Sequence, residues 1–198
     1  MSESKVWHSV HEAAGLSPSP WIVRYATLVS PGARVLDLAC GQGRHARWFA
    51  LRGCRVLAVD RDAAALAPLA GRPGIETAFL DLESGEWPLA GERFDAIVVT
   101  NYLHRPLFPH LLAALAVDGA LLYETFARGN EAYGRPSNPA FLLEPGELLR
   151  VIEGRLNVVA FEEGRIAVEG RDAVVQRIAA IGTGRAWPPV LASVDPPG

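Results

Sequence analysis

The sequence predicts a doubly wound α/β fold built on one seven-stranded sheet. Five short runs rich in valine, isoleucine and leucine alternate with helical patterns, as in parallel strands joined by helical crossovers that cover both sheet faces. These runs span residues 33–39, 55–60, 75–81, 94–101 and 119–126. Two further runs, 156–166 and 172–182, are joined by a short polar connection that cannot hold a helix. We therefore expect this last pair to be antiparallel, after five parallel strands.

Helices are predicted before and between the strands. Ser19 and Pro20 are suited to the N-cap and the first helical position of a helix near 20–29, and a further helix is expected near 4–14. The run 106–119 predicts a helix between the fourth and fifth strands. The N-terminal helices thus cover about residues 4–29.

Length and composition place the chain among single globular domains. Its 198 residues carry a net charge of −3 and 49% hydrophobic residues, which suits one domain over 1–182. Residues 183–198, rich in proline and glycine, are expected to form a surface-bound or mobile tail. The composition is not the basic one of a duplex-binding protein, and the sequence contains no apolar run long enough for a membrane. From the pattern of the first residues we expect no signal peptide. We expect a cytoplasmic protein with neither a nucleic-acid nor a membrane partner.

A glycine-rich turn follows the first predicted strand, in the stretch "VLDLACGQG" (35–43). Gly41 and Gly43 allow a tight turn and a close approach of a ligand to the backbone. Asp37 can accept hydrogen bonds from the turn or reach a cationic group of the ligand. A dinucleotide fingerprint would carry a third glycine, or sometimes an alanine, at position 46, so Ala46 alone does not decide between cofactors. An acid inside the strand, Asp37, argues more strongly against a nicotinamide cofactor.

This stretch, with the acidic residues that end the next two strands, resembles the class I S-adenosylmethionine-dependent methyltransferases. Their Rossmann-like sheet has the expected five parallel strands and an antiparallel terminal pair. In that family, the glycine turn wraps the methionine part of the cofactor. The resemblance implies that Asp60 holds the ribose hydroxyls, Asp81 contacts the adenine amine and Leu82 lies beside the ring. The implied cofactor residues are Asp37, Ala39, Gly41, Gly43, Asp60, Arg61, Asp81, Leu82 and Thr100.

The stretch 123–149, "YETFARGNEAYGRPSNPAFLLEPGELL", is similar to the segment after the fifth strand in tellurite-resistance-type methyltransferases. That similarity favours a small-molecule acceptor. Within it, residues 126–144 show little secondary-structure signal, and a long loop in a compact domain is usually functional. We interpret it as an ordered lid over the acceptor. The candidate acceptor contacts are Arg105, Asn130, Tyr133 and Arg135; Arg105 is equally suited to a salt bridge.

His104 and Tyr102 are the candidate catalytic residues, because they follow the fourth strand, where ligands of open α/β sheets bind. His104 has the chemistry of a general base near neutral pH. It is also suited to a structural role at the start of a helix.

The sequence therefore predicts an S-adenosylmethionine-dependent methyltransferase that acts on a small molecule by in-line transfer. No metal-ligand cluster is visible, so we expect metal-free catalysis. Two alternatives stay open: a non-catalytic protein that binds the same cofactor, and a nicotinamide-dependent oxidoreductase. The acceptor and the oligomeric state are not specified by the sequence.

Overall fold

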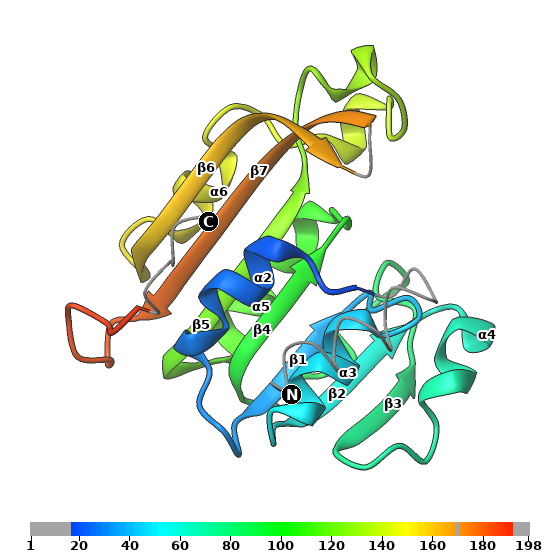
Figure 1. Cartoon of the computed structure of the whole chain (residues 1–198), viewed down its shortest axis with the longest axis vertical. Coiled ribbons are helices and arrows are strands. Elements are labelled where there is room, and N and C mark those ends of the chain that lie inside the picture. The colour runs from blue at the N-terminus through cyan, green and yellow to red at the C-terminus, as the bar shows by residue number, and fades with distance from the viewer. Residues whose placement is uncertain (1–16, 169–170, 192–198) are drawn as a thin grey trace, which may run out of the picture.

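A computed structural model describes residues 17–168 and 171–191 of the chain and places seven strands in one sheet, in the order β3-β2-β1-β4-β5-β7-β6 (Figure 1). The pairs from β3 to β5 are parallel, and β7 is antiparallel to both β5 and β6. The fold class predicted from the sequence is confirmed. The strands are β1 (Arg34–Leu38), β2 (Arg55–Asp60), β3 (Ile75–Phe79), β4 (Phe94–Thr100), β5 (Leu115–Phe126), β6 (Leu156–Val168) and β7 (Arg171–Gly182).

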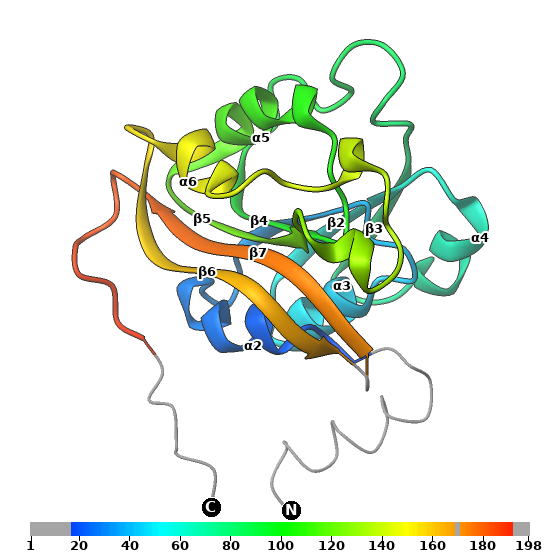
Figure 2. The ribbon, with the colours of Figure 1, turned by 90° about the horizontal axis from the view of Figure 1, so that it is seen from above.

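Helices cover both faces of the sheet, and the side chains of successive strand residues point to opposite faces. In β1, Val35 and Leu36 are both fully buried, yet they belong to two separate apolar clusters on opposite faces. Helices α2, α3 and α4 pack on one side and α5 and α6 on the other (Figure 2). Their bounds are α2 (Pro20–Tyr25), α3 (Arg44–Leu51), α4 (Ala63–Leu66), α5 (Phe108–Ala114) and α6 (Glu147–Ile152).

The N-terminal part of the fold begins as the sequence predicts. The side chain of Ser19 accepts a hydrogen bond from the backbone N–H of Trp21, and Pro20 opens α2. The helix is shorter than predicted, because a 3₁₀ turn replaces it at Ala26–Leu28. The helix predicted near 4–14 lies outside the described residues.

The prediction of a helix over 106–119 is wrong at its C-terminal half. A 3₁₀ turn precedes α5, which ends at Ala114, and β5 begins at Leu115. Leu115 pairs with Phe94 of β4, and the carbonyl of Val117 accepts the N–H of Gly184. These partners lie outside residues 106–119. Pairing with them as a strand overrides the local preference of residues 115–119 for a helix.

The strand order reverses direction between β1 and β4, which are neighbours although two strands separate them in sequence. The crossovers from β1 run one way along the sheet, and the crossover from β4 runs the other way. The loops that leave their carboxyl ends therefore diverge and form a crevice, the usual place for a ligand in such sheets. In the described residues, we find no helix with the length and apolarity that a membrane crossing requires.

Candidate functional site

The glycine turn at the carboxyl end of β1 is shaped both by packing and by open space. Gly41 and Gly43 have φ of 53° and 71°, in the left-handed region. A Cβ on Gly43 would collide with the side chain of Leu69, whereas a Cβ on Gly41 would meet no atom within 4 Å. Gly43 therefore serves the fold. Gly41 borders an open cavity, where the bare backbone admits a ligand.

Asp37 is buried beneath this turn, with 1% of its surface exposed. Its Oδ2 accepts the backbone N–H of Ala46 in the first turn of α3, at 2.8 Å. Burial raises its pKa to about 7, although the Ala46 bond and the nearby Arg44 act in the opposite direction. One carboxylate oxygen thus caps the helix. A positively charged ligand beside the carboxyl group would lower the pKa of Asp37.

Asp60, at the end of β2, connects the turn to the cavity. Its two carboxylate oxygens accept the backbone N–H groups of Gly41, at 2.7 Å, and Asp62, at 2.9 Å. The separate task of capping α4 falls to Asp62, which accepts from Ala64 and Ala65. Asp60 is consequently oriented by backbone donors and presents its carboxylate to the cavity, as a pair of vicinal hydroxyls would require.

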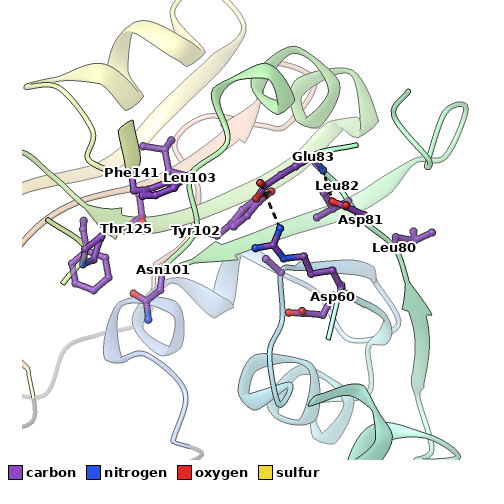
Figure 3. A pocket seen from close by; sticks show the side chains of 14 residues that line it. Asp60, Leu80, Asp81, Leu82, Glu83, Asn101, Tyr102, Leu103, Thr125 and Phe141 are labelled. Atoms are coloured by element: carbon purple, nitrogen blue, oxygen red, sulfur yellow. Dashed lines mark hydrogen bonds and ion pairs between the residues drawn. The ribbon is translucent and has the colours of Figure 1, made fainter. Parts of the chain in front are cut away.

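A cavity of about 370 Å³ opens at the carboxyl ends of the strands (Figure 3). Its walls come from the ends of β1 to β5 and from the segment after β5. It is lined by Ala39, Asp60, Arg61, Leu80, Asp81, Leu82, Glu83, Asn101, Tyr102, Leu103, Thr125, Phe126, Pro136 and Phe141.

One end of this cavity is acidic. Asp81 accepts the backbone N–H of Glu83 at 2.9 Å, and this bond holds the pKa of Asp81 below its usual value. Glu83 in turn accepts the hydroxyl of Tyr102 at 3.3 Å and lies 3.6 Å from the Arg61 guanidinium (Figure 3). Sequence reasoning missed Glu83; its position two residues after Asp81 was the available signal.

A second cavity of about 330 Å³ lies beside the first, against the glycine turn. The two cavities share Ala39 and Asn101, which are the described non-glycine residues with positive φ, 52° and 55°. Left-handed backbone of this kind is concentrated at binding sites. Gly41, Arg44 and Thr100 also line the second cavity. The predicted cofactor residues after β1 and β4 are thus brought together.

His45 contacts Thr100, which lines the second cavity. The sequence did not suggest this role. His45 is 1% exposed, and its Nε2 accepts the backbone N–H of Ser19 at 3.1 Å. The proton of the neutral ring is therefore on Nδ1, which donates to the hydroxyl of Thr100 at 3.4 Å. Burial, together with the charge of Arg44, lowers the pKa of His45 to about 3, so the ring is neutral at physiological pH.

Arg105, a predicted acceptor contact, is engaged elsewhere. Its guanidinium forms a two-point ion pair with Glu147 at 2.7 and 2.8 Å and donates to the carbonyls of Ala140 and Leu142. The salt-bridge alternative for Arg105 is the one observed. The residue fastens the segment around Phe141, which lines the cavity.

Asn130 has a similar role. It is 2% exposed; its amide nitrogen donates to the carbonyl of Pro136, and its oxygen accepts the N–H of Val174 in β7. Its hydrogen-bonding groups thus hold the segment 126–144, in place of the predicted acceptor contact. This segment also contains two 3₁₀ turns and a bridge between Ala127 and Leu143.

The other predicted acceptor and catalytic residues divide between the cavity and its surroundings. Tyr102 lines the cavity, and burial followed by the charge of Glu83 raises its pKa, so the phenol stays protonated. His104 begins the turn before α5 and is not a lining residue. Tyr133 contacts Arg165 at the surface, and the exposed Arg135 is also outside the lining.

A switch-point crevice, a glycine turn after the first strand and an acid that ends the second strand are features of α/β proteins that bind nucleoside-containing cofactors. Residues 35–117 match the model of a methyltransferase domain family. Over this stretch the chain is similar to a methyltransferase domain, in agreement with the class I S-adenosylmethionine-dependent methyltransferases that its motifs resemble.

Solved structures share the fold. The chain superposes on TehB from Haemophilus influenzae with a TM-score of 0.75 and 21% identity, covering 89% of this chain and 66% of that one. A 1,6-didemethyltoxoflavin-N1-methyltransferase from Burkholderia thailandensis, with S-adenosylhomocysteine bound, gives 0.62 and 22%, covering 91% and 86%.

A curated relative matches over a shorter stretch. Ribosomal RNA small subunit methyltransferase J of Psychromonas ingrahamii is 34% identical over 93 residues, which are 41% of this chain and 36% of that protein. The matched stretch therefore leaves most of that relative's length without a counterpart.

Proposed function

We propose that the protein transfers the methyl group of S-adenosylmethionine to a small-molecule acceptor. One observation carries the proposal: a single cavity joins the acidic residues expected at the cofactor to a wall of apolar residues from the segment after β5. Asp60 and Asp81 lie at one end, and Leu103 and Phe141 lie at the other (Figure 3). A cofactor and a small second molecule therefore have adjoining places.

The residues present fit this cofactor. Asp60 is oriented for the ribose hydroxyls, Asp81 and Leu82 border the place expected for the adenine, and Gly41 leaves the turn open to the methionine part. Bound S-adenosylmethionine supplies a methyl group on a sulfonium that is already a good leaving group. The protein then needs mainly to align the acceptor and exclude water.

The end of the cavity at Leu103, Thr125 and Phe141 has no carboxylate or imidazole among its described lining residues to remove a proton (Figure 3). The phenol of Tyr102 stays protonated and donates to Glu83, and His104 is not part of the lining. This favours a soft nucleophile such as a thiol, which needs little base assistance, over an alcohol.

Calorimetric titration separates this proposal from a nicotinamide-dependent alternative. We expect S-adenosylhomocysteine to bind and NAD to show no binding. Asp60→Asn should weaken S-adenosylhomocysteine, because an amide accepts fewer hydrogen bonds from a diol than a carboxylate does. Leu51→Ala, an exposed position at the end of α3, serves as the control. The cofactor assignment fails if NAD binds and S-adenosylhomocysteine does not.

Labelled methyl transfer then distinguishes an enzyme from a non-catalytic binding protein. The acceptor panel contains thiols, reduced chalcogens, phenols and carboxylates, together with small-subunit ribosomal RNA because of the partial match to an enzyme of that name. Transfer to RNA alone would refute the small-molecule proposal. Cofactor binding without any transfer would favour the non-catalytic alternative.

A further inference from the structure

We infer that the acceptor end of the cavity selects an uncharged, apolar acceptor and disfavours anions; this inference rests on the proposed function. The acceptor end is formed by Leu103, Thr125, Phe126, Pro136 and Phe141. These residues offer hydrocarbon surface, two aromatic rings and one hydroxyl, and none of them carries a charge. A ligand here gains free energy mainly by burying apolar area.

The charges that line the rest of the cavity work against an anion. Asp60, Asp81 and Glu83 are carboxylates, and Arg61 is the one cation in the lining as far as the described part of the chain goes. The Arg61 guanidinium faces Glu83 at 3.6 Å, so this positive charge is already paired at the acidic end. An anionic acceptor would enter a cavity whose lining is net negative and would lose its hydration there without a matching donor.

Two arginines near the acceptor end in sequence, Arg105 and Arg128, are held by other partners. The guanidinium of Arg105 donates only to Glu147 and to two backbone carbonyls among its recorded partners, and Arg128 pairs with Glu144 at 3.2 Å. Within residues 17–168 and 171–191, no arginine, lysine or histidine belongs to the lining of the acceptor end. The site therefore lacks the fork of donors that proteins use for carboxylates and oxyanions.

Hydrogen bonds hold the backbone on both sides of Phe141 and at Pro136, so this apolar wall is already in place without a ligand. Arg105 holds the carbonyls on both sides of Phe141, at Ala140 and Leu142, and Asn130 holds the carbonyl of Pro136. Phe141 keeps half of its surface exposed, 50%. A flat, apolar acceptor would cover this ring and gain an aromatic contact.

A pair of methylated aryl sulfides that differ by one carboxylate tests the inference by binding alone. We titrate thioanisole and 4-(methylthio)benzoate into protein saturated with S-adenosylhomocysteine. We expect a dissociation constant at least about ten-fold lower for thioanisole, which is about 1.4 kcal/mol. Phe141→Ala should weaken thioanisole about five-fold and leave S-adenosylhomocysteine unchanged. Leu51→Ala, which removes a similar exposed side chain remote from the cavity, should change neither.

The outcomes separate this inference from the proposed function. Equal or tighter binding of 4-(methylthio)benzoate overturns the inference. Binding of S-adenosylhomocysteine without saturable binding of thioanisole also overturns it, while the proposed function stands. Failure to bind S-adenosylhomocysteine overturns the proposed function and the inference with it. An unchanged thioanisole affinity in Phe141→Ala would overturn the assignment of the acceptor end.

Discussion

The ion pair between Arg105 and Glu147 should be worth more than a surface salt bridge, and replacing Arg105 by methionine measures it. Two hydrogen bonds of 2.7 and 2.8 Å join the two side chains, which are 37% and 13% exposed. Exposed pairs contribute roughly 0–1 kcal/mol, whereas breaking a buried pair costs about 3–5 kcal/mol. Because solvent reaches Arg105 but hardly reaches Glu147, we expect Arg105→Met to cost about 2 kcal/mol.

Urea denaturation measures this free energy, and the melting temperature should fall by roughly 4–8 °C at the usual 2–4 °C per kcal/mol for a domain of this size. Glu147→Gln keeps the side-chain length and the cap on the backbone N–H of Glu144, so it should cost less. The double variant should be less destabilised than the sum of the two, because each single change already breaks the pair. Additive effects would show that the pair is not a unit.

The same pair predicts a direction for the pH dependence. Burial raises the pKa of Glu147, but the hydrogen bonds from Arg105 and from the Glu144 backbone outweigh it and hold the pKa below its usual value. A carboxylate with a lowered pKa in the folded state stabilises the protein above its unfolded pKa, near 4.3, and this stability is lost as the pH falls through the folded pKa. Arg105→Met should therefore lose less stability than the wild type on acidification below about pH 4.5. If the two proteins respond equally, or if Arg105→Met costs under about 0.5 kcal/mol, the reasoning is refuted.

Four further substitutions test the cofactor side. Gly43→Ala should destabilise the fold by about 1–3 kcal/mol, because the new Cβ collides with Leu69 and strains a left-handed backbone. The Cβ of Gly41→Ala meets no protein atom. Calorimetry should therefore show that Gly41→Ala loses more S-adenosylhomocysteine affinity than stability. Asp60→Asn should weaken the same ligand about ten-fold, as the loss of one charge-assisted bond implies; an unchanged affinity would remove Asp60 from the site. Asp37 has a folded pKa raised from 3.8 to about 7, so its stabilising contribution is complete below pH 3.8 and is lost as the pH rises to about 7. Denaturation of Asp37→Asn should show that this decline, at most about 1.4 kcal/mol per pH unit, is absent.

The cofactor side could be predicted from the sequence because it is built from local signals. Asp37, Gly41 and Gly43 lie within one strand–turn–helix unit, and Asp60 and Asp81 each follow a hydrophobic run. Parallel strands bring such positions to one edge of the sheet whatever else the chain does. Placing these residues at one edge therefore required only the parallel strands that the alternation of strands and helices implied.

The acceptor side could not be predicted because partners distant in sequence decide its side chains. Arg105 finds Glu147 at a separation of 42 residues, and Asn130 finds Val174 at a separation of 44. Both residues were proposed as acceptor contacts on chemical grounds alone. Buried polar groups must find partners, and here the protein itself supplies those partners before any ligand can. His45 was missed for the same reason, since its partner Ser19 precedes it by 26 residues.

This difference between the two sides has a consequence for specificity. The candidate cofactor residues lie at the ends of β1 to β4, and the recorded hydrogen bonds of Asp37 and Asp60 join residues outside the segment 126–144. That segment is fastened to α6 through Arg105 and Glu147, and to β7 through Asn130. Substitutions at Phe141 or Pro136 can consequently change the acceptor wall while the fastenings and the cofactor residues remain. In a chain built in this way, the wall of the cavity that comes from the segment 126–144 can change while Asp37 and Asp60 keep their hydrogen bonds, so one fold can be adapted to different second ligands.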